Sequence, residues 1–224
     1  DPDWSRGLGD VYKRQDSMRI ILILLIPIFI SSCGSGSSES ETEGISPEPV
    51  PVVNIDPHQV GTLAREIVHD NIIRRFILYV PDSYDRNTPT PLLFNFHGYG
   101  SNAEQQMNYG DFRSIADNEG FLILHPQGTR LPSTGSTHFN VGGWTRGSNI
   151  DDVGFTNYLI NVISRLYNID ELKIFSTGMS NGGFMSYELA CKLSARIAGI
   201  ASVTGSMTPE TYDECVPDLS LIHI

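Results

Sequence analysis

Short apolar runs alternate with helix-compatible segments through the middle of the chain. Residues 92–96 and 121–124 are apolar at almost every position, which is typical of strands buried on both faces of a parallel sheet. Strands that alternate with helices predict a right-handed, mostly parallel α/β sheet flanked by helices. We expect the remaining strands at residues 66–69, 72–80, 172–175 and 197–203, and helices at residues 105–118, 153–167 and 184–191.

Polar residues mark the connections between these elements. Asp70-Asn71 is a turn-prone pair that joins two edge-type strands, and one carboxylate of Asp151-Asp152 is expected to cap the helix that follows it. The basic pair Arg74-Arg75 is expected on the solvent side of its strand. Residues 127–149 are rich in Gly, Ser and Thr, and so long an irregular segment in a compact domain favours a binding loop.

The region before this domain has the pattern of an exported lipoprotein. A positive start at Met18-Arg19 and a short apolar run are typical of a signal peptide, which we expect at residues 16–32. Small residues lead to Cys33, similar to a bacterial lipidation site, so Cys33 is expected to carry the lipid. The alternative is an ordinary secretory signal with an incidental cysteine. Residues 33–56 are Ser/Gly/Glu-rich and then Pro-rich, which predicts a flexible tether.

The two ends of the chain resemble sequencing-library adapters. When residues 10–15 and 219–224 are back-translated, the two stretches can be written as reverse complements of each other and match a transposon end. We therefore expect residues 1–15 and 219–224 to be adapter-derived and exclude them from the fold. The expected globular domain covers residues 57–218 and is incomplete at its C-terminus.

The charge of the chain narrows the classes of partner. A formal net charge of −11 argues against a nucleic-acid or anionic-membrane surface, because either would need a basic patch. Contact with a membrane is expected through the lipid anchor alone. No Cys/His spacing suggests zinc and no phosphate-binding loop is present, so we expect neither a metal nor another cofactor.

Chemistry is most clearly indicated by Gly178-Met179-Ser180-Asn181-Gly182. This stretch has the G-x-S-x-G pattern, follows an apolar strand and precedes a helix, which is the context of a nucleophile elbow. Ser180 is therefore expected to be a nucleophile; the alternative is that it only caps the helix. In such folds the acid and the histidine follow the serine in the chain. The one histidine after Ser180 is His223, in the adapter-derived end, so we expect the base to be missing from residues 57–218.

A glycine-bearing turn offers a second part of such a site. In His97-Gly98-Tyr99-Gly100, the turn after an expected strand can aim a backbone N–H at the oxyanion of a tetrahedral intermediate. The N–H of Asn181, directly after the nucleophile, would be its partner. His97 itself is expected to make a structural hydrogen bond, because it precedes the serine in the chain.

Several stretches in the same order resemble the poly(3-hydroxybutyrate) depolymerase-type esterases, a group that also holds feruloyl and acetylxylan esterases. The resemblance implies an α/β-hydrolase fold and ester hydrolysis through an acyl-serine. It makes Ser180 the nucleophile and gives the oxyanion-hole N–H groups to Tyr99 and Asn181. The group's Gly-Thr-x-Asp acid and later histidine have no counterpart here. The matching stretches are residues 75–81, 91–100, 143–144, 151–155, 178–183 and 189–191.

Three further residues are candidates for binding or stability. Trp144 could stack on an aromatic or sugar ring of a substrate, or it could be a buried core residue. Cys191 and Cys215 are expected to form a disulfide in an exported protein, with two free thiols as the alternative.

The leading hypothesis is an exported, membrane-anchored serine esterase that acts on polymeric or oligomeric esters and faces the periplasm or the cell exterior. Feruloyl or acetyl groups on xylan are favoured over a polyhydroxyalkanoate, because a surface-tethered enzyme suits an external polysaccharide. A peptidase of the same fold and a non-catalytic, surface glycan-binding protein are the alternatives.

Overall fold

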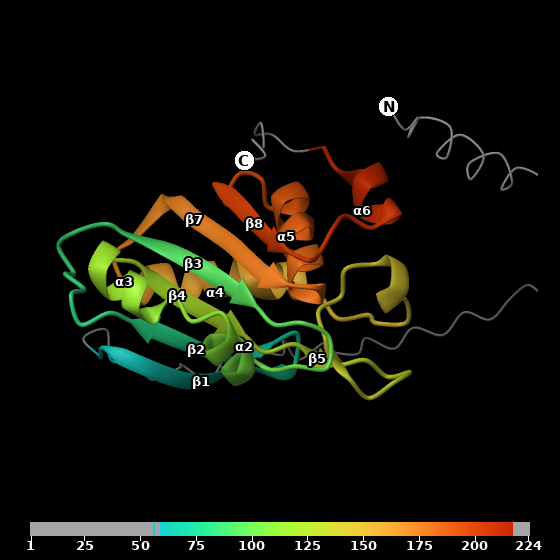
Figure 1. Cartoon of the computed structure of the whole chain (residues 1–224), viewed down its shortest axis with the longest axis horizontal. Helices are drawn as coiled ribbons and strands as arrows, with labels where there is room; N and C mark the ends of the chain where they lie inside the picture. Colours follow the sequence, from blue (N-terminus) through green and yellow to red (C-terminus); the bar gives the residue numbers. More distant parts are fainter. Residues whose placement is uncertain (1–55, 57–58, 217–224) are drawn as a thin grey trace, which may run out of the picture. The chain divides into compact units, whose positions relative to one another are not determined.

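The computed structural model describes residue 56 and residues 59–216, which belong to one compact unit that runs from Pro47 to Ile224 (Figure 1). The expected adapter-derived ends, signal peptide, lipidation site at Cys33 and tether before residue 56 all lie outside the described residues. Within residues 56 and 59–216, no helix is long and apolar enough to cross a membrane.

A six-stranded sheet forms the centre of the domain, in the order β1-β2-β4-β3-β7-β8. The pairs β4–β3, β3–β7 and β7–β8 are parallel, and β1–β2 and β2–β4 are antiparallel, which confirms the expected mostly parallel sheet. A short hairpin, β5 with β6, lies apart from this sheet. The strands are β1 (Gly61–His69), β2 (Ile72–Val80), β3 (Thr90–Phe96), β4 (Leu122–Pro126), β5 (Thr129–Arg130), β6 (Thr137–His138), β7 (Ile169–Met179) and β8 (Gly199–Val203).

The first two strands form a hairpin at one side of the sheet. Asp70 and Asn71 both have positive φ, 51° and 59°, as a two-residue hairpin turn requires. The prediction that both strands are edge strands is wrong for β2. Antiparallel pairing places β2 between β1 and β4, with Phe76 opposite Pro126, so only β1 lies at the edge.

Helices cover both faces of the sheet: Figure 1 shows α2 and α3 in front of the strands and α4 behind them. The single helix expected at residues 105–118 is instead two short helices, because α2 ends at Gly110 and α3 begins after it. The helices are α2 (Ala103–Tyr109), α3 (Arg113–Glu119), α4 (Asp152–Leu166), α5 (Asn181–Lys192) and α6 (Pro209–Glu214), with a 3₁₀ turn η1 (Gly143–Thr145).

Two helix starts are fixed by side-chain caps. Asp151 caps α4, since its carboxylate accepts the N–H of Gly154 at 2.7 Å, which confirms the expected aspartate cap. Helix α6 was not expected. Thr208 caps α6 and Pro209 opens it, a combination that fits the first turn of a helix.

The core lies between the sheet and the helices and contains one unexpected charge. Phe94, Phe96 and Phe155 are almost completely buried, and Arg74 is only 2% exposed among them. The prediction that Arg74 and Arg75 share the solvent side is therefore wrong. Successive side chains of a strand point to opposite faces, so only Arg75 can point outward.

Candidate active site

Ser180 lies at a sharp turn between β7 and α5, where a strand ends at residue 179 and a helix begins at residue 181. Its backbone has φ 52° and ψ −115°, a conformation that non-glycine residues rarely adopt. The hydroxyl makes no capping hydrogen bond to α5. The helix-cap alternative therefore gains no support from the geometry, and Ser180 lies half-buried with its hydroxyl free of the helix.

Glycines allow this turn to form, because the end of β3 lies directly against it. A Cβ at residue 182 would lie 2.6 Å from the carbonyl carbon of Phe96 and 2.9 Å from the carbonyl oxygen of His97. A Cβ at residue 178 would lie 2.6 Å from the carbonyl group of Gly182. These distances are shorter than van der Waals contact, so only glycine fits at positions 178 and 182.

The turn after β3 lies beside the nucleophile. The Cβ position of Gly98 is 3.7 Å from Cβ of Ser180 and 3.4 Å from the carbonyl oxygen of Met179. The next N–H groups of the turn are used for its own structure: Gly100 donates to Thr137 at 2.8 Å, and Ser101 donates to the Gly98 carbonyl at 3.1 Å. The Tyr99 N–H precedes both of these donors in the turn and directly follows Gly98, the glycine that lies against Ser180.

One N–H near the nucleophile is already occupied. The N–H of Ser180 donates to the carbonyl oxygen of Val203, the last residue of β8, at 2.8 Å. The N–H of Asn181 is at the first turn of α5, where backbone donors have no partner within the helix. Asn181 thus offers the nearest helix-terminal donor to the Ser180 hydroxyl.

His97 makes structural hydrogen bonds with both of its ring nitrogens. Nδ1 contacts the Gly98 carbonyl at 2.7 Å, and Nε2 accepts the N–H of Gly128 at 2.9 Å, which sets Nδ1 as the protonated nitrogen. Burial lowers the pKa of His97 to about 4, so the ring is neutral at pH 7. This arrangement fixes the turn beside Ser180 and agrees with the structural role expected for His97.

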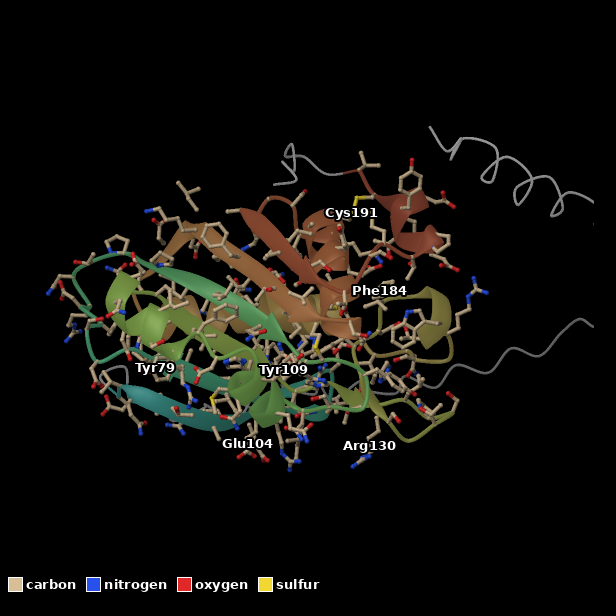
Figure 2. All side chains as sticks on the ribbon, viewed as in Figure 1. Tyr79, Glu104, Tyr109, Arg130, Phe184 and Cys191 are labelled. Atoms are coloured by element: carbon tan, nitrogen blue, oxygen red, sulfur yellow. A yellow bond between two sulfur atoms is a disulfide. The ribbon has the colours of Figure 1, made fainter. Side chains whose placement is uncertain are left out.

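Three aromatic rings lie together beside the elbow. Trp144 contacts the ring of Tyr99 at a centroid distance of 5.5 Å and the ring of Phe184 at 6.0 Å, both edge to face. Trp144 is 47% exposed and Tyr99 38%, so the cluster is open to solvent. Figure 2 shows Phe184 near the start of α5, on the side of the segment that carries η1. The core alternative for Trp144 does not fit this exposure.

Residues 139–150, here named the Trp144 loop, are organised around the side chain of Asn140. Its amide nitrogen donates to the carbonyl of Ile150 at 3.0 Å, and its amide oxygen faces the Thr145 hydroxyl at 3.3 Å. The same hydroxyl donates to the Gly142 carbonyl at 2.7 Å. These bonds close the loop on itself, so that η1 and Trp144 are held as one unit.

Two buried side chains attach this loop to the rest of the domain. Asn181 Oδ1 accepts the N–H of Phe139 at 2.7 Å, and its Nδ2 donates to the carbonyl of the same residue at 3.0 Å. Asp152 Oδ2 accepts the N–H of Asn140 at 2.7 Å, while Oδ1 accepts from Arg74 at 2.5 Å. Burial raises the pKa of Asp152, and the charge of Arg74 opposes that rise.

Helix α6 supports the loop from a third direction. The hydroxyl of Thr208 donates to the Val141 carbonyl at 3.3 Å, and Glu210 forms an ion pair with Arg146. The sulfur atoms of Cys191 and Cys215 are bonded, which joins α5 to the end of α6. Figure 2 places Cys191 near the far end of α5 from Phe184.

No base stands beside Ser180 in the part of the chain that the structure describes. Residues 181–216 contain no histidine. His97 is engaged at both nitrogens, and His125 at the end of β4 is buried, with its pKa lowered by burial to about 4. The described residues around Ser180 therefore bring together a candidate nucleophile and candidate oxyanion donors, with no histidine among the described residues that follow the serine to accept a proton.

One group of metal-ligating side chains lies at the β1–β2 hairpin. Ligand atoms of His69, Asp70 and Asp151 lie within 4.8 Å of one another. Asp151 already accepts the Gly154 N–H as a helix cap, and Nε2 of His69 lies 3.4 Å from Asp70. Exposed carboxylates of this kind are common without a metal, and no step of the chemistry below uses them.

Curated relatives connect this geometry with esterases. The chain is 30% identical to feruloyl esterase D from Neurospora crassa over 138 residues, which is 59% of this chain and 46% of that enzyme. It is 32% identical to feruloyl esterase C from Emericella nidulans over 134 residues, covering 60% and 47%. A bifunctional acetylxylan esterase/xylanase from Neocallimastix patriciarum is 27% identical over 128 residues, covering 57% and 17%. The chain spans about half the length of these feruloyl esterases. No family model matches the chain.

Solved structures share the fold. An S-formylglutathione hydrolase from Agrobacterium tumefaciens aligns with a TM-score of 0.52 at 17% identity, covering 70% of this chain and 61% of that one. A ferulic acid esterase aligns with a TM-score of 0.51 at 15% identity, covering 63% and 59%. The expected α/β-hydrolase fold and the expected resemblance to feruloyl and acetylxylan esterases are confirmed.

Sequence reasoning brought Ser180, Tyr99, Asn181 and Trp144 to one site, and the structure places them together. It missed that the Asn181 side chain holds the Trp144 loop and that Asp152 pairs with Arg74. Asn181 lies 42 residues from Phe139 in the chain, and Asp152 lies 78 residues from Arg74. No local pattern reports contacts over such separations.

Proposed function

Because the chain has the α/β-hydrolase fold and resembles feruloyl and acetylxylan esterases, we propose that the full-length protein is a serine esterase that hydrolyses esters on a polymer or oligomer through an acyl-serine intermediate. The observation that carries this proposal is the strained backbone of Ser180, φ 52°, at a glycine-lined turn between β7 and α5. Strain of this kind persists where the surrounding structure holds a residue in place for function.

In the first step the Ser180 hydroxyl attacks the ester carbonyl carbon. The hydroxyl proton passes to a general base, the new C–O bond forms, and the carbonyl oxygen becomes an oxyanion. The proton then goes to the leaving alcohol as its C–O bond breaks, which leaves an acyl-serine. Water repeats the sequence and releases the acid.

Two backbone N–H groups are proposed to stabilise the oxyanion. The N–H of Asn181 follows the nucleophile at the start of α5, and that of Tyr99 follows the glycine packed against the Ser180 side. The N–H of Ser180 is not a donor in this scheme, since Val203 already accepts it. Loss of one such donor typically costs about 3 kcal/mol of transition-state stabilisation.

The base and the acid of the triad are proposed to be supplied by the full-length protein after the described residues. In the α/β-hydrolase order both follow the nucleophile. Neither His97 nor His125 is proposed for the role, because each precedes Ser180 and each is held neutral in a buried position.

The substrate is proposed to carry a planar or ring-shaped group that rests on Trp144. The exposed rings of Tyr99, Trp144 and Phe184 form an apolar surface beside Ser180, suited to an aromatic acyl group or a sugar ring. Feruloyl or acetyl esters of xylan are favoured over polyhydroxyalkanoate. The protein is further proposed to be exported and anchored by a lipid on Cys33, with the disulfide between Cys191 and Cys215 suited to that location.

The test is Ser180→Ala in the full-length protein, assayed with an aryl acetate and a methyl hydroxycinnamate. We expect hydrolysis of both esters to fall by at least about a thousandfold, because the nucleophile is lost. Ser206→Ala, an exposed serine on the segment after β8, is the matched control and should keep full activity. Unchanged hydrolysis by Ser180→Ala would remove Ser180 from the mechanism.

The same experiment separates the alternatives. A peptidase of this fold would hydrolyse a peptide and leave both esters intact. A glycan-binding protein would hydrolyse neither and would bind xylo-oligosaccharide equally well with Ala or Ser at position 180.

A further inference from the structure

We propose that the side chain of Asn181 is a positioning residue that fixes Trp144 relative to Ser180 and thereby sets the preference of the site for esters large enough to reach Trp144. The inference rests on the proposed esterase function and adds a specificity device to it. Asn181 would then have two separable roles, one for its backbone N–H and one for its side chain.

The Asn181 side chain makes both of its hydrogen bonds to one residue of the Trp144 loop. The amide of Asn181 is completely buried, and it accepts from the N–H and donates to the carbonyl of the same residue, Phe139, at 2.7 and 3.0 Å. This pairing satisfies both backbone groups of Phe139 as a neighbouring strand would. Since Asn181 directly follows Ser180, the nucleophile and the start of the Trp144 loop are separated by one residue and two hydrogen bonds.

Hydrogen bonds within the Trp144 loop couple the position of Phe139 to that of Trp144. Asn140, next to Phe139, bonds to the Ile150 carbonyl and faces the Thr145 hydroxyl, while the Val141 N–H donates to the same hydroxyl at 3.0 Å. Thr145 is completely buried and adjoins Trp144. A shift of Phe139 therefore moves η1 with it, and the Trp144 ring moves against Tyr99 and Phe184.

Replacement of the Asn181 side chain keeps its backbone N–H, and any change in the oxyanion hole would lower hydrolysis of both esters alike and cancel in their ratio. Every residue at position 181 except proline keeps the backbone N–H that is proposed to bind the oxyanion. An ester too small to touch Trp144 needs Ser180, the general base and the two N–H groups of the oxyanion hole, but not Trp144. An ester with a planar aromatic acyl group needs Trp144 as well, so the two substrates report the two roles separately.

The experiment uses full-length Asn181→Ala, with Ser186→Ala as the control. Ser186 is a buried polar residue of the same helix, and its hydrogen bonds go to Ser176 of β7 and to the Gly182 carbonyl of α5, not to the Trp144 loop. We expect the ratio of kcat/KM for methyl ferulate to that for p-nitrophenyl acetate to fall about tenfold in Asn181→Ala, through KM, and to stay unchanged in Ser186→Ala. Asn181→Asp, which keeps the acceptor for the Phe139 N–H but turns a carboxylate oxygen toward the Phe139 carbonyl, should lower the ratio at least as much as Asn181→Ala.

A second readout does not depend on activity. Fluorine NMR of fluorotryptophan-labelled protein, with the Trp144 resonance identified by Trp144→Phe, should show that resonance shifted in Asn181→Ala and unmoved in Ser186→Ala. Equal loss of both esters together with an unmoved Trp144 resonance overturns the positioning role and leaves the esterase proposal standing. Absence of ester hydrolysis in the unsubstituted protein overturns the esterase proposal, and the Trp144 resonance still decides whether Asn181 positions the loop.

Discussion

The nucleophile elbow and the Trp144 loop are neighbours that are held in place in opposite ways. At the elbow, backbone packs directly on backbone, because Gly178 and Gly182 leave no side chain between β3, β7 and α5. In the Trp144 loop, buried polar side chains do the holding: Asn181, Asp152 and Asn140 each bond to backbone groups of the loop.

Because of this difference, the proposed reactivity and the proposed specificity depend on separate groups of residues. The elbow needs positions without a side chain, so almost any larger residue at position 178 or 182 would disrupt it. The loop depends on polar pairs, so its position responds to single exchanges that leave the elbow intact. Three sets of substitutions and one change of pH test this contrast, and they follow in order of decreasing expected effect.

Gly182→Ala tests the elbow directly. The new methyl group would overlap the carbonyl groups of Phe96 and His97, so we expect a loss of more than about 4 kcal/mol in the free energy of unfolding. Gly199→Ala is the control, because its nearest neighbour, the Phe175 ring, would lie 3.5 Å away in ordinary contact. Urea unfolding of both variants provides the measurement. Equal stability of the two would contradict backbone-on-backbone packing as the basis of the elbow.

Arg74→Met tests the charged support of the Trp144 loop. It leaves the Asp152 carboxylate buried without its cation, which typically costs about 3–5 kcal/mol. Arg75→Met, one residue along β2 and exposed, should cost less than about 0.5 kcal/mol. Thermal or urea unfolding of the pair measures the difference. A similar stability for both variants would mean that the ion pair does not hold the loop.

Replacement of Cys191 and Cys215 by serine tests the support from α6. The two residues are 24 positions apart, and the chain-entropy relation predicts a loss of about 3.5 kcal/mol in the free energy of unfolding. We expect amide hydrogen exchange to rise in residues 139–150 more than in residues 178–184, since α6 contacts the loop through Thr208 and Glu210. An equal rise in both segments would remove the distinction between them.

Acidification tests the turn beside Ser180. Burial lowers the pKa of His97 to about 4, whereas the unfolded chain titrates near 6.5, so the unfolded state binds more protons between these values. The free energy of unfolding should therefore fall by up to about 3 kcal/mol from His97 as the pH drops from about 6.5 to about 4. His97→Gln should show a shallower dependence in urea unfolding across that window. The same slope as in the unsubstituted protein would place the titration elsewhere.

The predictable parts of this fold are those that the sequence encodes locally. Strands β3 and β4 follow from runs that are apolar at almost every position, and the elbow follows from glycines that a sharp turn requires. The break at Gly110 between α2 and α3 was missed because the surrounding residues are polar and helix-compatible on both sides. Helix α6 was missed although Thr208 and Pro209 carry a recognisable start.

The supports of the candidate site were not predictable in the same way. Arg74 was expected in solvent because a charge is rarely buried, yet its strand position faces the core and Asp152 lies there to receive it. Asn181 was expected to act through its N–H alone. The partner of its side chain, Phe139, lies in an irregular loop, and no hydrophobic periodicity predicts the path of that loop.

The hydrogen bond from the Ser180 N–H to the Val203 carbonyl makes the last residue of β8 part of the reactive turn. Within the described residues β8 pairs with β7 alone, so its other side is an open edge. A strand that pairs with this edge would extend the sheet beside the strand that is bonded to Ser180. The open border of the sheet is thus one strand, and one hydrogen bond, away from Ser180.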